Sequence, residues 1–305
     1  MARHILVIKL GALGDFVQAM GPMAAIRAHH AGDRITLLTT KPFAELAGSS
    51  PWFDAVWVDD KPKLHQPLRW LALARRLRGG AFDFVWDLQT SDRSCAYFRL
   101  MGRPPWSGNA RGCSHPHANP ARGAMHTVDR QAEQLAMAGI DAVPPPDLSW
   151  MPADIAGFGL PARFAVLAPG GAPHRPAKRW PAGHFAELAT RLAQAGLAPV
   201  LTGTESERAA NARIMAACPS AIDLTGRTSR LADLVGLGRA ATLALGNDTG
   251  PMHLLAAAGC RCAVLFSAES DPARCAPRGA VTVLRRPDLA DLPVAEVAAS
   301  LGIPA

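Results

Sequence analysis

Short apolar runs alternate with helical patterns along the whole chain, and this alternation constrains the fold more than any other feature. The runs that indicate buried strands occur at 4–10, 34–40, 55–60, 82–89, 164–170, 198–203, 241–248 and 262–267. Helical patterns separate them, such as residues 184–196, which end at a glycine. Strands that alternate with helices in this way predict a parallel sheet covered by helices on both faces.

The alternation is interrupted once, at residues 142–154, where three consecutive prolines stand. Such a run fits neither a helix interior nor a central strand, so the segment predicts a linker. A length of 305 residues also fits two domains. We therefore predict an α/β fold of two Rossmann-like, doubly wound domains, residues 1–150 and 151–305. Open parallel sheets bind ligands at the carboxyl ends of their strands, so we expect the two domains to face each other across a cleft.

Composition narrows the class of protein. The chain is 49% apolar and 19% charged, which is typical of a globular protein. Its net charge of +7 is divided as +4 before and +3 after residue 150, so no basic arm for nucleic acid stands out. This excess suits an anionic small ligand or an anionic membrane surface, and equally ordinary solubility.

Cysteine usage and the amino-terminal sequence bear on the cellular compartment. The six cysteines form no Cys-x-x-Cys pair, so neither a zinc site nor a secreted disulfide framework is indicated. The first 17 residues do not form a signal peptide, and no run of 18 apolar residues exists. We expect a cytoplasmic protein that is able to dock on a membrane.

The segment 243–260, LALGNDTGPMHLLAAAGC, joins a predicted strand to a predicted helix. Its Asp-Thr-Gly is also the motif of aspartic proteases, but a second copy is missing and the strand–helix alternation is wrong for that class. Asp248 or Thr249 can cap the helix, and Pro251 fits its first turn. Unpaired amides at that helix start could bind a diphosphate, or the segment could be a well-capped structural helix.

The first loop, KLGALGD at 9–15, lies where a dinucleotide fingerprint would lie. It has only Gly11 and Gly14, and no acid ends the second strand, so a nicotinamide enzyme is disfavoured. Asp15 could act as a general base toward an acceptor hydroxyl, or it could be a first-turn acid of the next helix.

Two loops of the second half carry charged candidates. The loop 168–181 combines glycines with His174, Arg175, Lys178 and Arg179, which favours anion binding over a merely solvated loop. The turn 201–208 carries Glu205 and Glu207 near a strand end, where an acid can accept hydrogen bonds from ribose hydroxyls or cap a helix.

Some expected motifs are absent from the sequence. There is no Asp-x-Asp, which often clamps a metal–diphosphate, and no P-loop. A cluster of Cys113, His115, His117 and His126 could hold a metal, but its spacing matches no zinc pattern. We predict no metal and no cofactor.

Taken together, five motifs give the chain its resemblance to glycosyltransferase family 9, the lipopolysaccharide heptosyltransferases. They are LGALGD, Asp-Leu-Gln at 87–89, Lys-x-Trp-Pro at 178–181, Gly-Thr-Glu at 203–205 and GNDTGPMH at 246–253. The resemblance runs nearly end to end. It implies the GT-B fold, in which the last helix often crosses back to the first half, together with inversion at the anomeric carbon and no metal.

Carried over by position, the resemblance assigns roles to particular residues. Asp15 would be the catalytic base, and Lys178 would contact the donor phosphates. The remaining donor or substrate contacts would be Gly11, Gly14, Glu205, Asp248, Thr249, Gly250, Met252 and His253. On the acceptor side, the candidates are Asp87, Gln89 and Arg111.

The implied reaction moves a heptose from a nucleotide diphosphate, ADP-heptose, to an anionic glycolipid acceptor of the lipopolysaccharide core. No nucleic acid partner is expected. We expect a peripheral contact with the cytoplasmic face of the inner membrane. The chain departs from the family at Pro169–Pro173 and at Pro251-Met252, which leaves the sugar open. The alternatives are a transferase of the same fold that uses another nucleotide sugar, and a non-catalytic protein that binds sugar nucleotides.

Overall fold

The computed structural model describes residues 2–172 and 174–304, and the chain divides into two compact units, residues 1–146 and 147–305. The division falls inside the proline-rich segment that the sequence analysis assigned to a linker. Each unit is built around one six-stranded sheet in which every pairing is parallel. The predicted α/β class is confirmed.

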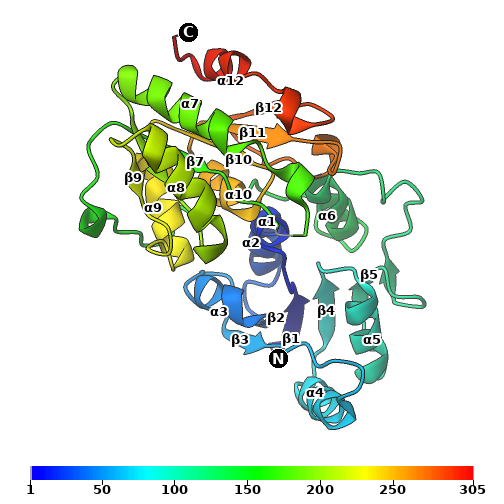
Figure 1. Cartoon of the computed structure of the whole chain (residues 1–305). Coiled ribbons are helices and arrows are strands. Elements are labelled where there is room, and N and C mark those ends of the chain that lie inside the picture. The colour runs from blue at the N-terminus through cyan, green and yellow to red at the C-terminus, as the bar shows by residue number, and fades with distance from the viewer. Residues whose placement is uncertain (1, 173, 305) are drawn as a thin grey trace. The chain divides into compact units, whose positions relative to one another are not determined.

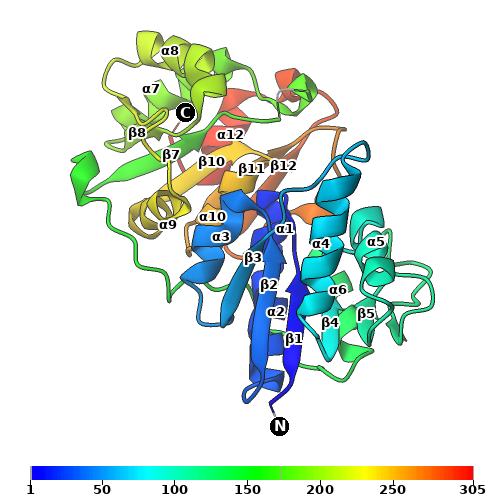
Figure 2. The same ribbon diagram turned by 90° about the horizontal axis from the view of Figure 1, so that it is seen from below.

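The first unit has the strand order β3-β2-β1-β4-β5-β6, and its first five strands lie side by side in Figure 2. The strands are β1 (His4–Ile8), β2 (Arg34–Thr39), β3 (Ala55–Val58), β4 (Phe84–Asp87), β5 (Trp106–Gly108) and β6 (His115–Pro116). Residues Ile5–Ile8 of β1 are fully buried because β2 and β4 flank this strand and helices cover both faces. This is why the strand appears in the sequence as a continuous apolar run.

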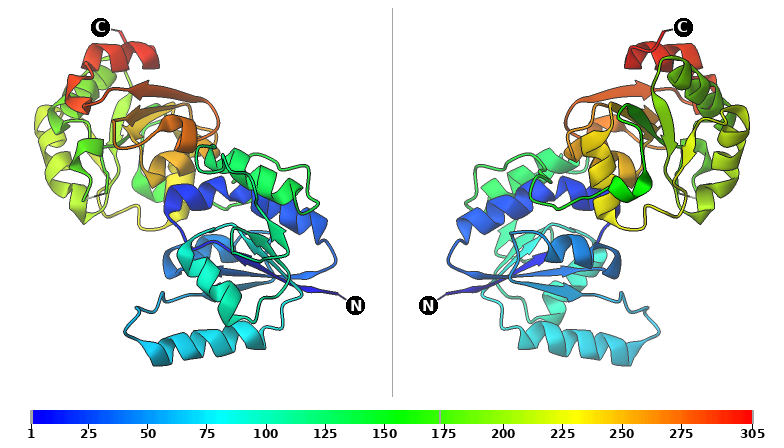
Figure 3. Two further views of the ribbon diagram at one scale, coloured as in Figure 1. Left: turned by 90° about the vertical axis from the view of Figure 1, so that its right-hand side faces the viewer. Right: turned by 90° about the vertical axis from the view of Figure 1, so that its left-hand side faces the viewer.

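Helices cover both faces of the first sheet. They are α1 (Leu13–Gln18), α2 (Met20–His29), α3 (Lys41–Gly48), α4 (Pro67–Gly79), α5 (Asp92–Leu100) and α6 (Thr127–Ala136). Helices α1, α2 and α6 lie on one face, while α4 and α5 lie on the other (Figure 3). Stacking of Phe16 on Phe43, with ring centroids 4.9 Å apart, joins α3 to α1.

The second unit repeats the same topology, with strand order β12-β11-β10-β7-β8-β9. Its strands are β7 (Phe164–Ala168), β8 (Ala198–Leu201), β9 (Ile222–Asp223), β10 (Leu243–Asn247), β11 (Cys262–Phe266) and β12 (Val281–Arg285). Strands β7, β10, β11 and β12 can be followed side by side in Figure 1. The short or edge strands β5, β6, β9 and β12 were not predicted, because two- and three-residue strands and an exposed edge show no apolar run.

The helices of the second unit are α7 (Ala182–Gln194), α8 (Arg208–Ala217), α9 (Leu231–Ala240), α10 (Gly250–Ala257), α11 (Pro272–Cys275) and α12 (Val294–Leu301), with the short 3-10 turns η1 (Ala156–Phe158), η2 (Pro176–Lys178), η3 (Glu205–Glu207) and η4 (Leu289–Asp291). The last helix, α12, packs against α7 of its own unit. Val297 and Leu301 are buried there, one helical turn apart on the same face.

Both strand orders change direction at one place: between β1 and β4 in the first unit, and between β7 and β10 in the second. Chain connections leave to opposite sides at such a point, so the carboxyl ends of the two strands are open to a ligand. The sequence motifs fall at these two places. Residues 9–15 and 87–89 follow β1 and β4, and residues 169–178 and 248–253 follow β7 and β10.

Candidate functional site

The carboxyl end of β10 leads directly into helix α10, with Thr249 at the N-cap and Pro251 in the first turn. The Thr249 side chain makes no capping hydrogen bond; its Oγ1 donates instead to the carbonyl of Asn247, 3.2 Å away. The first amides of α10 are therefore not consumed by a side-chain cap. Thr249 therefore stands at the N-cap, one of the two positions expected, but without a side-chain capping bond, and this helix start stays suited to an anion.

Lys178 forms an ion pair with the residue that precedes this helix start. It ends the turn η2, and its Nζ lies 2.7 Å from Oδ2 of Asp248. Ser270 donates to the same carboxylate oxygen from 2.7 Å. Both side chains of the ion pair are largely buried, with 13% of Lys178 and 8% of Asp248 exposed. A cation, an acid and a helix start thus meet at the end of β10.

Asn247 holds the loop that carries Lys178. It is fully buried, and its Oδ1 accepts a hydrogen bond from the backbone amide of Trp180 at 2.9 Å. Its Nδ2 donates to the carbonyls of Pro169 and Gly170, both at 2.9 Å. The indole of Trp180 in turn donates to the carbonyl of Leu292. One amide side chain therefore fixes both ends of the loop 169–180 to the end of β10.

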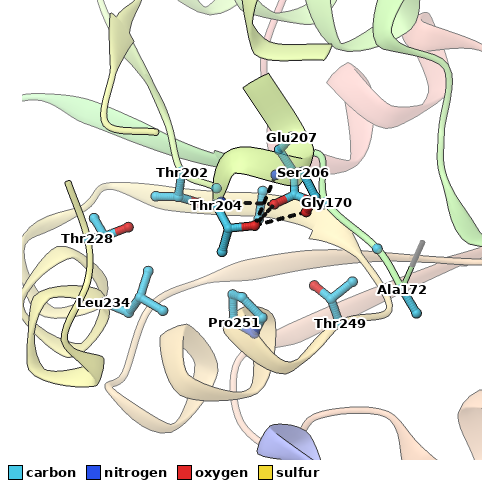
Figure 4. Close-up of a pocket in the computed structure, with 13 residues that line it drawn as sticks. Gly170, Ala172, Thr202, Thr204, Ser206, Glu207, Thr228, Leu234, Thr249 and Pro251 are labelled. Atoms are coloured by element: carbon cyan, nitrogen blue, oxygen red, sulfur yellow. Dashed lines mark hydrogen bonds between the residues drawn. The ribbon is translucent and has the colours of Figure 1, made fainter. Parts of the chain in front are cut away.

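A pocket of about 290 Å³ opens beside these residues (Figure 4). Glycines 170, 171 and 203 form part of its wall, and Thr249 and Pro251 contribute from the start of α10. Ala168, Leu234 and Pro251 supply apolar surface, while Thr202, Thr204, Ser206 and Thr228 supply hydroxyls. Apolar walls with a few polar groups suit a flat base and its sugar.

The acid of this pocket is Glu207. Its carboxylate accepts from the amide of Thr204 at 2.9 Å and from the Ser206 hydroxyl at 2.6 Å, as dashed in Figure 4. Burial opposes its ionisation, but the hydrogen bonds from Ser206 and Thr204 outweigh burial and hold the pKa of Glu207 below its ordinary value. The predicted ribose ligand, Glu205, does not line this pocket; it is 77% exposed and paired with Arg208 at 2.6 Å.

The other predicted donor residues of the second unit lie near α10. Met252 is fully buried, with its sulfur packed against Gly246, and His253 is also buried. Neither lines the pocket, whereas Gly250 is the first residue of the helix. A Cβ on Gly246 would lie 2.6 Å from the Met252 sulfur and 2.8 Å from the Ala168 carbonyl, so this strand end requires glycine.

Asp15 lies in the first turn of α1, beyond the end of β1, and is partly exposed. Gly11 precedes it with φ of +114°, and a Cβ there would lie 2.7 Å from the Phe43 ring. Gly14 is inside the same turn. The two glycines therefore shape the backbone that presents Asp15.

A buried lysine that sequence analysis did not select lies beside Asp15. Lys9 follows β1, is 3% exposed, and its Nζ donates to the carbonyl of Leu88 at 3.2 Å. Burial lowers its pKa to about 8, and the charges of Asp15 and Asp87 partly counter that effect. The signal was visible in the sequence, because Lys9 interrupts an otherwise apolar run.

The predicted acceptor residues have different surroundings. Asp87 is fully buried, and its Oδ1 accepts from the amides of Gln89 and Thr90. Burial raises the pKa of Asp87 to about 6 against these hydrogen bonds. Gln89 accepts from the amide of Leu10 at 2.8 Å, so its side chain joins the segments that follow β1 and β4. Arg111 is exposed in the loop after β5.

Residues of the candidate metal cluster, such as Cys113, His117 and His126, make separate hydrogen bonds within the fold. His126 accepts from the amide of Val128 at the start of α6, and His117 accepts from Arg122 at 3.2 Å. Cys113 donates toward the carbonyl of Gly108. Over residues 2–172 and 174–304, no three His, Cys, Asp or Glu side chains come together as a metal site would need.

Comparison with known proteins identifies the family. The model of "Glycosyltransferase family 9 (heptosyltransferase)" matches residues 70–286, more than half of the chain. The chain belongs to glycosyltransferase family 9. Lipopolysaccharide heptosyltransferase 1 of Pseudomonas aeruginosa PAO1 is 26% identical over 281 residues, which cover 83% of this chain and 76% of that protein.

Solved structures share the fold of this family 9 chain. The E. coli ADP-heptose LPS heptosyltransferase II is 22% identical with a TM-score of 0.80, over 99% of this chain and 98% of that one. The E. coli heptosyltransferase WaaC with ADP is 20% identical with a TM-score of 0.78, over 98% and 99%. The predicted GT-B type, two Rossmann-like halves in one chain, is confirmed, and as a family 9 member the protein is a glycosyltransferase.

Several residues of the family 9 chain that build the site were not selected from its sequence. They are Lys9, Asn247 and Ser270. Glu207 was named together with Glu205 as an acid that could accept hydrogen bonds from ribose hydroxyls, whereas the family resemblance assigned that contact to Glu205. The loop 169–180 also carries His174 and Arg175, which are exposed, and Arg179, which donates to the carbonyl of Gly171. Of the segment 169–173 that departs from the family pattern, Pro173 lies outside the described residues.

Proposed function

We propose that this family 9 glycosyltransferase moves a heptose from ADP-heptose to an anionic glycolipid of the lipopolysaccharide core, with inversion and without a metal. The observation that carries the proposal is the joint position of Lys178, Asp248 and the α10 start beside a pocket suited to a nucleoside. The relatives named above carry the same sugar chemistry in their names.

The pocket supports a nucleoside diphosphate as donor. Its apolar wall would cover the base, and Glu207 would accept hydrogen bonds from ribose hydroxyls. The diphosphate would then extend along the glycines at 170 and 171 toward Thr249 and Gly250. Glycines allow the backbone to approach phosphate oxygens closely, and the helix start favours their negative charge.

Lys178 and the start of α10 would stabilise the departing diphosphate, which gains about one negative charge as the glycosidic bond breaks. Removing one preorganised donor of this kind costs roughly 2.7–4 kcal/mol of transition-state stabilisation. Two or three such groups acting together can therefore replace a metal ion. Asp248 binds Lys178 and would hold the ammonium in position, and Ser270 donates a hydrogen bond to the same Asp248 carboxylate.

Asp15 would act as the base. It takes the proton from the acceptor hydroxyl as that oxygen attacks the anomeric carbon from the face opposite the diphosphate. The buried side chain of Lys9 lies beside Asp15. Asp15 belongs to the first unit and Lys178 to the second.

The acceptor would be reached at a membrane from the cytoplasmic side. In the described part of the chain, none of the helices has the length and apolar character needed to span a bilayer. We therefore propose a peripheral contact, which the net charge of +7 would favour on an anionic surface.

The substitution Asp15→Asn tests the proposal most directly. We expect loss of transfer with ADP-heptose while nucleotide binding persists, because only proton removal is affected. Asp141→Asn, an exposed acid of the same unit, is the matched control and should keep full activity. Retained turnover in Asp15→Asn would remove Asp15 from the role of base.

A donor panel separates the proposal from its two rivals. ADP-heptose should raise the melting temperature most, since a ligand at 100 times its Kd adds about 2.7 kcal/mol of stability. A larger shift with another nucleotide sugar would indicate a different glycan. Binding without any product would indicate a non-catalytic protein. Activity should also survive EDTA, and loss on chelation would point to a metal enzyme.

A further inference from the structure

Large apolar side chains that are exposed concentrate on one short segment of the first unit. Leu64 is 92% exposed, Leu68 is 80% exposed and Leu71 is 46% exposed. They lie within eight residues, in the loop before α4 and in its first turns. Single exposed leucines need no explanation, but three together on one surface indicate that something covers them.

Helix α4 has two apolar sides. Leu73, Ala74 and Leu77 are buried, and Leu73 and Leu77 pack into the core of the first unit. At about 100° per residue, Leu68 lies on the side opposite Leu77. Figure 3 shows α4 as the outer layer of this unit, so that side points away from the sheet. The exposed leucines are therefore not required by the core that the same helix builds.

Positive charge surrounds the leucines. Residues 61–82 contain six Lys or Arg and no Asp or Glu, in a chain whose net charge is +7. On the helix, Arg75 lies on the same side as Leu68 and Leu71, with Arg69 and Arg78 on the two flanks. The nearest acid before this segment is Asp60, whose carboxylate lies 3.9 Å from Arg69.

We propose that this α4 surface, formed by Leu64, Leu68 and Leu71 with the surrounding Lys and Arg side chains, docks the protein on an anionic lipid bilayer. The leucines would enter the boundary between headgroups and acyl chains, and the cations would contact lipid phosphates. A helix with apolar side chains toward the bilayer and cations along its flanks is the arrangement of interfacial helices. The inference rests on the proposed peripheral contact and assigns it to particular residues.

A second copy of the chain fits this surface less well than a bilayer does. In a two-fold dimer the same patch meets itself, so the basic segment of one protomer would face that of the other. Like charges brought together in this way oppose association. An anionic bilayer, in contrast, offers apolar and negatively charged partners at once.

The test uses the full chain and sedimentation with vesicles. Vesicles of phosphatidylcholine with phosphatidylglycerol should bind the protein, whereas pure phosphatidylcholine should bind it much less. The double variant Leu68→Gln with Leu71→Gln should lose about tenfold or more of this binding. Met137→Gln, which replaces another exposed apolar side chain of the first unit, is the matched control and should bind normally.

Charge is tested separately. Arg75→Gln should weaken binding about fivefold and reduce its salt dependence, while Arg213→Gln in α8 should not. Circular dichroism and melting temperature should be unchanged in all variants, because the replaced side chains are exposed.

Three results would overturn the proposal: no binding of the natural sequence to anionic vesicles, equal binding by the leucine variant, or a dimer in analytical ultracentrifugation that the leucine variant abolishes. Vesicle binding is measured without sugar transfer. Its failure is therefore distinguishable from failure of the proposed reaction, which the soluble donor assays report.

Discussion

Replacing Asn247 with aspartate changes little in shape and tests how the donor loop is held. In the variant, Oδ1 still accepts from the Trp180 amide. The side-chain NH2, which donated to the carbonyls of Pro169 and Gly170, is replaced by a second carboxylate oxygen. Two hydrogen bonds of about 1 kcal/mol each are lost, and a charge is buried against two acceptors. We expect a loss of about 2–4 kcal/mol of unfolding free energy near neutral pH, or about 4–16 °C in the melting of the second unit.

The loss should depend on pH. The new carboxyl, buried beside two carbonyls, would have a folded-state pKa raised above its unfolded value of about 3.9. A protonated carboxyl can donate to one of those carbonyls, so stability is highest below the unfolded pKa. It falls by about 1.4 kcal/mol per pH unit as the pH rises to the folded pKa, and then levels.

The assay is urea unfolding of Asn247→Asp and the natural sequence from about pH 5 to about pH 8. Gln194→Glu, which adds an exposed carboxylate to the same unit, is the control and should follow the natural sequence. The donor KM should rise together with the loss of stability, because the loop also carries Lys178. A variant as stable as the natural protein, or one whose loss does not vary with pH, would refute the role given to Asn247.

Three other substitutions test separate contacts. Lys178→Ala should lower kcat by about 10²–10³ and raise the donor KM; an effect on KM alone would exclude transition-state stabilisation. Gly246→Ala should lower the free energy of unfolding in urea by about 1–3 kcal/mol, because its Cβ would lie 2.6 Å from the Met252 sulfur. The control Gly183→Ala, whose Cβ would meet no atom within 4 Å, should leave the free energy of unfolding unchanged. A buried lysine with a folded-state pKa of about 8 makes the free energy of unfolding rise with pH from about pH 8 to about pH 10.5, and Lys9→Met should remove this rise. An unchanged dependence of stability on pH in the variant would contradict the burial of a charged Lys9.

The architecture was predictable from the sequence because the strands at the centre of each sheet are short, mostly apolar runs separated by helical patterns. Strands β1, β7, β10 and β11 are buried almost throughout, since neighbours and helices enclose them. Edge strands such as β6 and β9 have two residues each and no run to detect. Their pairing depends on contacts made by distant parts of the chain.

The site was only partly readable, because residue type does not determine where a side chain points. Glu205 and Glu207 are two residues apart, yet the turn η3 exposes the first and directs the second into the pocket. Asp87 ends an apolar strand and Asp248 directly follows one, but Asp87 is fully buried whereas Asp248 forms an ion pair with Lys178. The sequence indicated a special role for Asn247 in one way only: its polar amide ends a strand whose other residues are apolar.

The ion pair between Lys178 and Asp248 has a consequence for selectivity. Without a donor, the ammonium is already neutralised by a carboxylate at 2.7 Å. A simple anion makes only a charge interaction with Lys178, so its binding free energy is reduced by the cost of competing with the Asp248 carboxylate. A nucleotide brings base and ribose into the neighbouring pocket as well, so it can share or displace the carboxylate. We therefore expect the site to prefer a nucleotide over free phosphate.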